Sequence, residues 1–261
     1  MTVIGTYSSR ASYRPMSAIR IGTAGWSVPR KYRSVFADAE TGLERYASKF
    51  NAVEINSSFY RSHRASTWTR WRDNTPSDFR FSVKMPKAIT HEHGLIGCSE
   101  LIERFLDEVA GLEERLGVLL VQLPPKRSFD ADASQSFFDQ LNSRTSIPVA
   151  CEPRHASWFT GDVERFLIRN RIALVGADPA ICPAAARPTG WTGLRYWRLH
   201  GSPAMYRSNY AERLPTYAAD LNADGTAGPS WCIFDNTASG AATGDALALS
   251  EMLAHAPATA G

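Results

Sequence analysis

The sequence predicts a single-domain α/β fold, the (β/α)8 TIM barrel, and three observations favour it. The chain has 261 residues, which suits eight strands and eight covering helices. Short apolar runs recur along it, and each is followed by a helix-like segment, as in βαβ units. In several of these runs a charged residue alternates with apolar neighbours, so that it would point to the opposite face of a strand, as at Glu54, Lys84 and Arg198. We expect those charges to face the barrel axis near its open end.

The eight predicted strands are short apolar segments that end in polar residues. They are residues 19–22, 52–57, 79–84, 118–123, 148–152, 173–177, 195–200 and 231–235. An open doubly wound sheet is the alternative, but it usually has fewer strands and a glycine-rich first turn. Residues 23–27 read Thr-Ala-Gly-Trp-Ser, which is not that turn. The pattern therefore favours closure.

Helical periodicity is clearest in residues 99–116 and 245–253. The first of these carries Leu101, Phe105 and Val109 on one face. Residues 202–229 contain several Pro and Gly, which predicts a long loop with a short helix at 216–222.

The barrel is predicted to occupy residues 19–255, between a flexible N-terminal tail (1–18) and a frayed C-terminus (256–261). The tail has no apolar run typical of a signal peptide or membrane span, which predicts a cytoplasmic protein with no membrane partner. Four scattered cysteines predict reduced, buried thiols. The net charge of +3 is too small to require a polyanionic partner, and it leaves nucleic acid open.

Polar residues gather where the predicted strands end, and in a parallel barrel those ends converge on the active site. Four of them could transfer protons and are the predicted catalytic residues: Glu54, Lys84, Glu152 and His200. The predicted substrate-binding residues are Trp26, Asn56, Tyr60, Gln122, Arg154, His155, Arg198, Asp235 and Asn236. Asp178 ends the sixth strand.

The same charged residues could instead have a purely structural role. Glu54 could form an ion pair with Lys84 on the adjacent strand, and Glu152 could hold Arg154 or Arg198. Lys84 could form a Schiff base, or it could anchor a carboxylate or phosphate.

A protein-bound metal or other cofactor is not predicted. His91-Glu92-His93 lies in a loop and lacks the four-residue spacing of a zinc-binding helix. An anion site is a further possibility, because small residues after the seventh and eighth strands, at 200–202 and 236–240, could present backbone N–H groups to a phosphate. Ordinary turn and N-cap chemistry explains the same residues.

Aromatic residues are also predicted near the strand ends, where they could stack on a base or sugar or simply close the core. They are Trp26, Phe59, Tyr60, Trp158, Tyr206 and Tyr210. Tyr206 and Tyr210 bracket Arg207, which suggests a mobile lid, with plain loop packing as the alternative.

Motifs along almost the whole chain resemble the YecE-like family, domain of unknown function 72. They are Ile21-Gly22-Thr23-Ala24-Gly25-Trp26, Val53-Glu54-Ile55-Asn56, Val83-Lys84-Met85-Pro86, Gln122-Leu123-Pro124-Pro125, Glu152-Pro153-Arg154-His155, Leu199-His200-Gly201 and Phe234-Asp235-Asn236. The resemblance implies a TIM barrel with a pocket lined by these strand-end residues, and it implies no activity. Asp235 and Asp245 stand where the family pattern leads us to expect Asn, which adds charge and removes an amide donor.

The leading hypothesis is a metal-independent enzyme that acts by acid–base chemistry on a small polar or anionic ligand. A hydrolase, an isomerase and a lyase all fit such a site. The alternatives are a nucleic-acid-binding or phosphoester-hydrolysing barrel, broadly similar in shape to abasic-site endonucleases, and a non-catalytic ligand-binding or interaction protein. The oligomeric state is not predicted.

Overall fold

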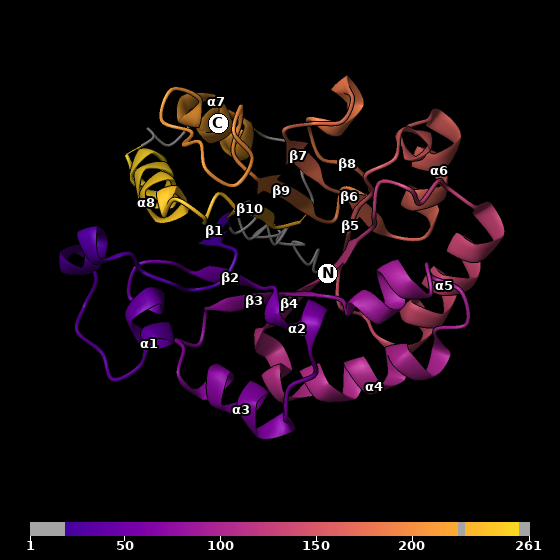
Figure 1. Ribbon diagram of the computed structural model, residues 1–261, viewed down its shortest axis with the longest axis horizontal. Coiled ribbons are helices and arrows are strands. Elements are labelled where there is room, and N and C mark those ends of the chain that lie inside the picture. Colours follow the sequence, from indigo (N-terminus) through magenta and orange to yellow (C-terminus); the bar gives the residue numbers. More distant parts are fainter. Residues whose placement is uncertain (1–18, 224–227, 256–261) are drawn as a thin grey trace, which may run out of the picture.

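Parallel strands lie at the centre of the structure and helices surround them (Figure 1). The computed structural model describes residues 19–223 and 228–255. The predicted tail at 1–18 and the predicted frayed end at 256–261 lie outside the described residues. Within the described part of the chain, no helix is long and apolar enough to cross a membrane.

The strands form two hydrogen-bonded sheets. The first has the order β1 (Ile19–Thr23), β10 (Ser230–Phe234), β9 (Arg195–Leu199) and β7 (Gly176–Asp178). The second has the order β2 (Ala52–Ile55), β3 (Arg80–Lys84), β4 (Leu116–Gln122), β5 (Val149–Glu152), β6 (Ile172–Leu174) and β8 (Thr189–Gly190). Among these pairs only β6 and β8 run antiparallel. A mixed α/β fold is therefore confirmed, and the closed barrel stays a prediction.

The two sheets approach each other at two places. A parallel bridge between Ala24 and Glu54 joins the ends of β1 and β2. The predicted strand 173–177 divides into β6 and β7, with only Val175 between them. Val175 N still donates to Cys151 O of β5, whereas Gly176 already pairs with Trp197 of β9. A change of hydrogen-bonding partner therefore splits this strand.

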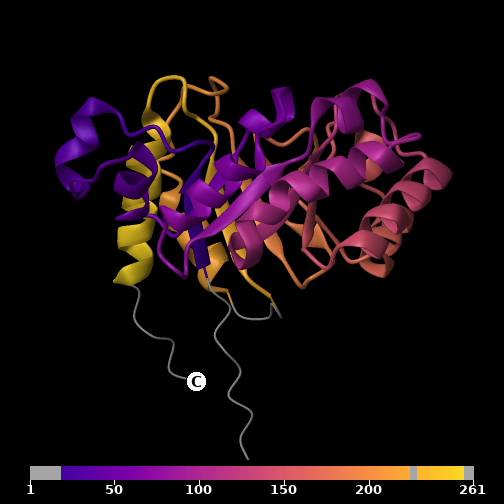
Figure 2. The same cartoon turned by 90° about the horizontal axis from the view of Figure 1, so that it is seen from below.

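Eight α-helices lie around the strands of the described chain (Figure 2). They are α1 (Gly42–Ala47), α2 (Ser57–Tyr60), α3 (Ala65–Asp73), α4 (Ser99–Val109), α5 (Ala131–Arg144), α6 (Gly161–Arg169), α7 (Leu214–Asn222) and α8 (Ala241–Ala254). Shorter turns are η1 (Arg30–Val35), η2 (Ala88–Glu92), η3 (Ala110–Arg115), η4 (Ala156–Trp158) and η5 (Pro183–Ala185). Helix α7 begins two residues before its predicted start.

Two helix predictions were wrong in their bounds. The predicted helix 99–116 ends at Val109, because Glu113 adopts a φ of 48° that an α-helix cannot contain, and η3 takes its place. The last helix begins at Ala241 rather than Asp245, because Gly240 is left-handed (φ 71°) and serves as its N-cap.

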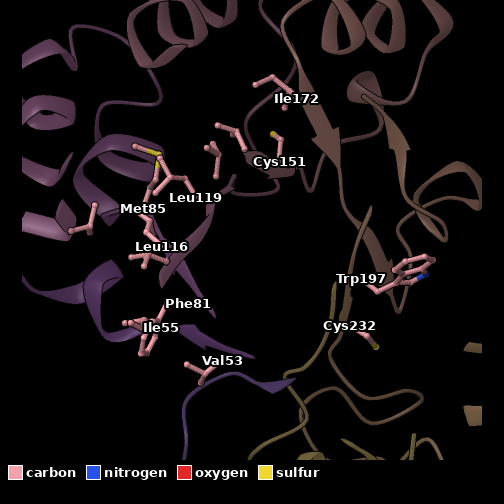
Figure 3. Packing of buried hydrophobic residues seen from close by; sticks show 14 of the residues in the cluster. Val53, Ile55, Phe81, Met85, Leu116, Leu119, Cys151, Ile172, Trp197 and Cys232 are labelled. Carbon is pink, nitrogen blue, oxygen red and sulfur yellow. The ribbon is translucent and has the colours of Figure 1, made fainter. Parts of the chain in front are cut away.

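Two apolar clusters lie on the two faces of the strands. Successive residues of a strand point to opposite faces, so Val53 joins one cluster and Ala52 the other. Figure 3 shows members of the larger cluster, such as Val53 and Trp197, on strands of both sheets; this cluster also contains helix residues. The smaller cluster, here called the inner cluster, consists of Ala52, Val118, Leu120, Ala150, Ala173, Val175, Leu194, Tyr196, Trp231 and Ile233.

The inner cluster brings together strands that are not hydrogen-bonded to each other. Tyr196 of β9 and Trp231 of β10 stack at 5.9 Å, and Trp231 also reaches β4. A Cβ atom on Gly117 would lie 2.7 Å from the Trp231 ring, so only glycine leaves room there. The inner faces of the two sheets therefore pack on each other.

Candidate functional site

A buried set of charged residues lies beyond the inner cluster, toward the carboxyl ends of the strands. Glu54 follows Ala52 by two residues and Glu152 follows Ala150, so each carboxylate shares a strand face with a residue of the inner cluster. Arg198 likewise follows Tyr196 of the inner cluster by two residues. Alternation along the strands thus places these charges on the inner face.

Arg198 is the centre of this charged cluster. Its Nε and Nη2 donate to Oε2 and Oε1 of Glu54 at 2.9 and 2.6 Å, which makes a bidentate pair. Its Nη1 donates to Glu152 Oε2 at 2.5 Å, and Nη2 lies 3.2 Å from Asp235 Oδ2. Strand β9 is not hydrogen-bonded to β2 or β5, so the guanidinium spans the space between the two sheets. Arg198 is only 1% exposed, and burial alone would lower the pKa of its guanidinium. The surrounding carboxylates outweigh burial and raise that pKa overall.

His200 joins two of the same carboxylates. Its Nδ1 lies 3.0 Å from Asp235 Oδ2, and its Nε2 lies 2.8 Å from Glu152 Oε1. Arg154 Nη2 lies 3.0 Å from the same Nε2 and 2.7 Å from Glu152 Oε1. A protonated Nε2 would donate to Glu152, whereas a neutral Nε2 would accept from Arg154. Proton gain or loss at His200 therefore changes which neighbour it binds.

The carboxylates around His200 are held in their charged form. Burial alone would raise their pKa values, but Arg198 and His200 outweigh it, so the pKa of Glu152 lies well below its usual range and that of Asp235 is also lowered. Burial opposes the charged form of His200, yet Glu152 and Asp235 raise its pKa overall. Glu152 is therefore a paired carboxylate rather than a proton donor near neutral pH.

Glu54 is paired with Arg198, and the alternative of an ion pair between Glu54 and Lys84 is not what the structure contains. Both Glu54 oxygens accept from the guanidinium, and the Tyr196 hydroxyl lies 2.9 Å from Oε2. That hydroxyl also lies 2.8 Å from Ser82 Oγ. Arg198 takes the place of Lys84 because its longer, forked side chain reaches Glu54 from the opposite sheet.

Lys84 is the charged residue of the site without a carboxylate partner within 4 Å among the described residues. Its Nζ lies 4.2 Å from the centroid of the Phe59 ring. Burial first, and then the charge of Arg198, lower its pKa to about 8. The residue is half-buried, so Lys84 is partly desolvated without being enclosed.

The cluster has an excess of positive charge when Lys84 and His200 are protonated. It contains three carboxylates and four basic groups: Glu54, Glu152 and Asp235 against Lys84, Arg154, Arg198 and His200. Arg154 Nε is buried and has no partner among the described residues. Both the unbalanced charge and the unused donor favour an anion.

Other predicted ligand-binding residues lie at the strand ends, and among the described residues their side chains form no hydrogen bond with the charged cluster. Gln122 Nε2 donates to Leu123 O at 3.0 Å, and His155 Nδ1 accepts from Ser157 N at 3.2 Å at the start of η4. Asn56 Oδ1 is buried and has no partner in the described chain. Trp26 packs edge-on against Trp71 of α3, with ring centroids 5.1 Å apart.

Two of the aromatic residues close the core, which is one of the two alternatives that the sequence left open. Trp158 is 1% exposed and packs at 5.0 Å against Phe129. Tyr210 is equally buried, and its hydroxyl donates to Asp178 O at 3.0 Å. For Tyr210, one of the two tyrosines that bracket Arg207, this burial favours plain loop packing over a lid; Tyr206 is 43% exposed. Tyr60 is instead 79% exposed and meets Phe59 edge-on.

Two neighbours of the site, Ser82 and Tyr196, were missed in the sequence, and a third, His91, was considered only as a metal ligand. Tyr196 contacts Glu54, and Ser82 contacts the Tyr196 hydroxyl. Each stands two residues before a predicted site residue, a spacing that could have found them. His91 meets the Phe59 ring edge-on at 4.9 Å, and burial together with Lys84 lowers its pKa. Only the fold of η2 brings His91 there.

Asn236 and Asp245 form a second buried polar contact beside the site. Asn236 Nδ2 donates to Asp245 Oδ2 at 2.7 Å, and Tyr210 N donates to the same oxygen at 3.1 Å. Asn236 Oδ1 is buried and has no partner among the described residues. Burial raises the pKa of Asp245, so its charge is a cost to the fold.

Asp245→Asn is expected to raise the free energy of unfolding by about 1 kcal/mol at pH 7, since it removes a buried charge and adds an amide that can donate to Asn236 Oδ1. A raised carboxyl pKa destabilises the folded state above that pKa and costs nothing once both states are protonated. The gain should therefore disappear as pH falls below the carboxyl's ordinary range. Urea unfolding of both proteins from pH 3 to 8 checks this, and an unchanged or lower stability at pH 7 contradicts it.

The residues weighed as metal ligands are separate in the structure. Glu92 pairs with Lys87 at 3.2 Å, and His91 Nδ1 lies 2.9 Å from Thr90 Oγ1. Within the described residues, no group of three or more His, Cys, Asp or Glu side chains is arranged to hold a metal ion.

The fold and the site define a mixed α/β protein with a buried ion-pair cluster where its parallel strands end. The chain belongs to the family described as Protein of unknown function DUF72, whose match covers residues 20–260. It is 35% identical over 178 residues to UPF0759 protein YecE of Escherichia coli K12, and 29% identical over 150 residues to UPF0759 protein YunF of Bacillus subtilis.

These alignments cover part of each protein. The match to YecE includes 65% of this chain and 62% of the relative, and the match to YunF includes 54% and 52%. Two solved structures share the fold over more of the chain. A DUF72 family protein of Thermotoga maritima has a TM-score of 0.74 at 25% identity and covers 91% of this chain and 99% of its own. One of Enterococcus faecalis has a TM-score of 0.75 at 22% identity, with 90% and 95% covered.

Proposed function

We propose that this chain is an enzyme that binds a small anionic molecule where its parallel strands end and acts on it by acid–base chemistry. The observation that carries the proposal is the excess positive charge of the cluster, together with the Lys84 amine and the Arg154 Nε, which have no hydrogen-bond partner in the described chain. A bound anion would balance the charge and use both donors.

The proposal includes the closed (β/α)8 barrel that the sequence predicts. Its support is the bridge between Ala24 and Glu54 at one junction and the single residue Val175 at the other. The inner cluster supports it too, since strands of both sheets contribute to it. In a closed barrel Arg198 would cross the axis to reach Glu54, and all strand ends would open on one mouth.

Within this proposal the four predicted catalytic residues have different roles. Lys84 is the proton-transfer group, because its pKa of about 8 lies near neutral pH and the residue is not enclosed. His200 changes its hydrogen-bonding partner between Glu152 and Arg154 when it gains or loses a proton. Glu54 and Glu152 are positioning residues, since their oxygens already accept from Arg198.

The chemistry is proposed to be metal-independent for a related reason. Carboxylate oxygens that accept from Arg198, His200 and Tyr196 have few lone pairs left for a cation. Guanidinium groups in the same cluster would also repel a cation.

Thermal unfolding with a panel of small carboxylates and phosphate esters tests the proposal at constant ionic strength, because a ligand of the folded state raises the melting temperature. At least one anion is expected to raise it in the wild type and in Lys87→Met, but not in Lys84→Met. Lys87 is a matched control, as it is exposed and pairs with Glu92. The same shift in both variants, or no shift with any anion, overturns the proposal.

Catalysis is then tested with the anion found. In deuterium oxide, wild-type protein is expected to exchange a carbon-bound proton of that anion or convert it, as followed by proton NMR, and Lys84→Met is not. Binding without exchange or conversion in the wild type would leave a ligand-binding protein instead.

Nucleic acid remains the second proposed partner, as the sequence allowed. Contacts with several phosphates would make binding fall steeply with salt, whereas a single anion site responds modestly. The cytoplasmic location also stays a prediction.

A further inference from the structure

A separate cleft lies where β1 and β10 end and α8 begins. Its volume is about 290 Å³, and its lining residues are Thr23, Ala24, Gly25, Ser27, Pro29, Thr237, Gly240, Ala242 and Thr243. The lining is small and hydroxyl-bearing, and it contains no acidic side chain. A cleft of this size and chemistry suits a compact polar group.

The N-terminus of α8 opens on this cleft. The helix has 14 residues, its N-cap Gly240 provides no side-chain cap, and its first turn has no acidic residue. Ala242 N donates to Asn236 O at 3.3 Å, while the N–H groups of Ala241 and Thr243 have no partner among the described residues. These free donors and the helix dipole make this end of α8 favourable for an anion.

Thr243 is a second, independent observation at the cleft. Its side chain lines the cleft although the residue is only 2% exposed. Its hydroxyl has no hydrogen-bond partner in the described chain, and it is not among the fully enclosed polar atoms that lack one. The hydroxyl therefore keeps some accessible surface and is available to a ligand in the cleft.

The segment beside the cleft is basic. Pro29 lines the cleft and leads into η1, where Arg30, Lys31 and Arg33 are exposed. This segment packs directly on α8, since a Cβ added to Gly244 would lie 2.2 Å from Tyr32 Oη. Its positive charge would attract an anion to the open cleft.

The carboxylate nearest the N-terminus of α8, that of Asp245, does not line the cleft. Asp245 Oδ2 accepts from Asn236 Nδ2 and Tyr210 N, and Asp245 is absent from the residues that line the cleft. Lys31 acts on it electrostatically and lowers its pKa against the larger effect of burial. The acid therefore leaves the free N–H groups of the helix available.

We propose that this cleft binds the terminal phosphate group of a small phosphate monoester. The backbone N–H groups of Ala241 and Thr243 and the Thr243 hydroxyl would donate to its oxygens. Ala24 of the cleft pairs with Glu54, and Thr237 follows Asp235 by two residues, so the rest of the molecule would extend toward the charged cluster. That the molecule bound in the cleft is also the substrate rests on the proposed function. That the cleft binds a phosphate group does not depend on it.

Binding of inorganic phosphate to the full chain, measured by calorimetry at constant ionic strength, tests the proposal. Thr243→Val removes the hydroxyl while keeping the shape, and it is expected to weaken phosphate about tenfold. Thr243→Ser should restore binding. Ser250→Ala is the matched control, because it removes a hydroxyl from the far end of the same helix, where Ser250 Oγ donates to Ala246 O at 2.8 Å.

The outcomes separate this proposal from the proposed function. If phosphate binding is lost in Lys84→Met but unchanged in Thr243→Val, the anion binds at the charged cluster. That result overturns the proposed cleft site and leaves the proposed function standing. Equal binding by all variants, or no binding of phosphate, overturns the cleft as well. An oligonucleotide without terminal phosphate that competes as well as a phosphate monoester would replace a small molecule with nucleic acid and contradict the proposal.

Discussion

Arg198→Met is expected to lower the free energy of unfolding at pH 7 by about 4 kcal/mol, the largest effect of any single change considered. The guanidinium is 1% exposed and holds Glu54 and Glu152, which are 0% and 1% exposed. Removing one partner of a buried ion pair leaves the other charges uncompensated, and that typically costs 3–5 kcal/mol. Urea unfolding followed by circular dichroism measures the loss.

The loss should depend on pH in a defined direction. Arg198 lowers the pKa values of Glu152 and Asp235, so the stability that these pairs supply is present near neutral pH and disappears as pH falls through the lowered values. The difference between wild type and Arg198→Met should therefore shrink in acid. Arg195→Met on the same strand is the control, with an expected loss of about 1 kcal/mol, because Arg195 bonds only carbonyl and hydroxyl oxygens. Equal losses of unfolding free energy in both variants would show that the buried ion pairs stabilise the fold no more than the hydrogen bonds of Arg195 do, and would contradict the prediction.

Lys84→Met is expected to stabilise the fold at pH 7 by about 3 kcal/mol while removing anion binding. Folding lowers the pKa of this amine from 10.5 to about 8, and each pKa unit corresponds to about 1.4 kcal/mol. Below pH 8 the amine is charged in both states, so the folded state pays the full cost of burying it. Above pH 10.5 it is neutral in both states, and the cost is gone.

Urea unfolding of wild type and Lys84→Met at pH 7 and pH 11 checks the sign. The variant should be more stable at pH 7, and the two proteins should approach each other at pH 11. Lys84→Arg, which keeps the charge, should not be stabilised. A variant less stable than wild type at pH 7 would show that the ammonium group stabilises the fold. The inference that Lys84 serves function at a cost to stability would then have no support.

Local patterns in the sequence predicted where the strands and the larger helices lie. They could not predict the split of strand 173–177, because it depends on a change of partner from β5 to β9 around Val175. They could not predict the end of α4 either, since a left-handed Glu113 has no signal in the sequence comparable to Gly or Pro. Strand ends and helix ends are set by neighbours that only the fold supplies.

The charged cluster follows from alternation along each strand, which is a local property. Glu54, Glu152 and Arg198 were therefore expected on one face, and the structure brings them into contact. Which charges pair is a different matter, because it depends on how far a side chain reaches across the interior. For that reason Arg198, not Lys84, holds Glu54. Whether Trp158 stacks on a ligand or closes the core was left open, because an aromatic ring near a strand end has no pattern that separates the two, and the structure buries it.

The pKa of Lys84, measured by carbon-13 NMR after reductive methylation of the lysines, tests most directly whether the strand ends enclose one charged site. We predict a value near 8 in the wild type and a higher one in Arg198→Met, since burial and the neighbouring guanidinium lower it. A value near 10.5 that does not respond to Arg198→Met would mean that Lys84 faces open water, away from the other charges, and would contradict the site.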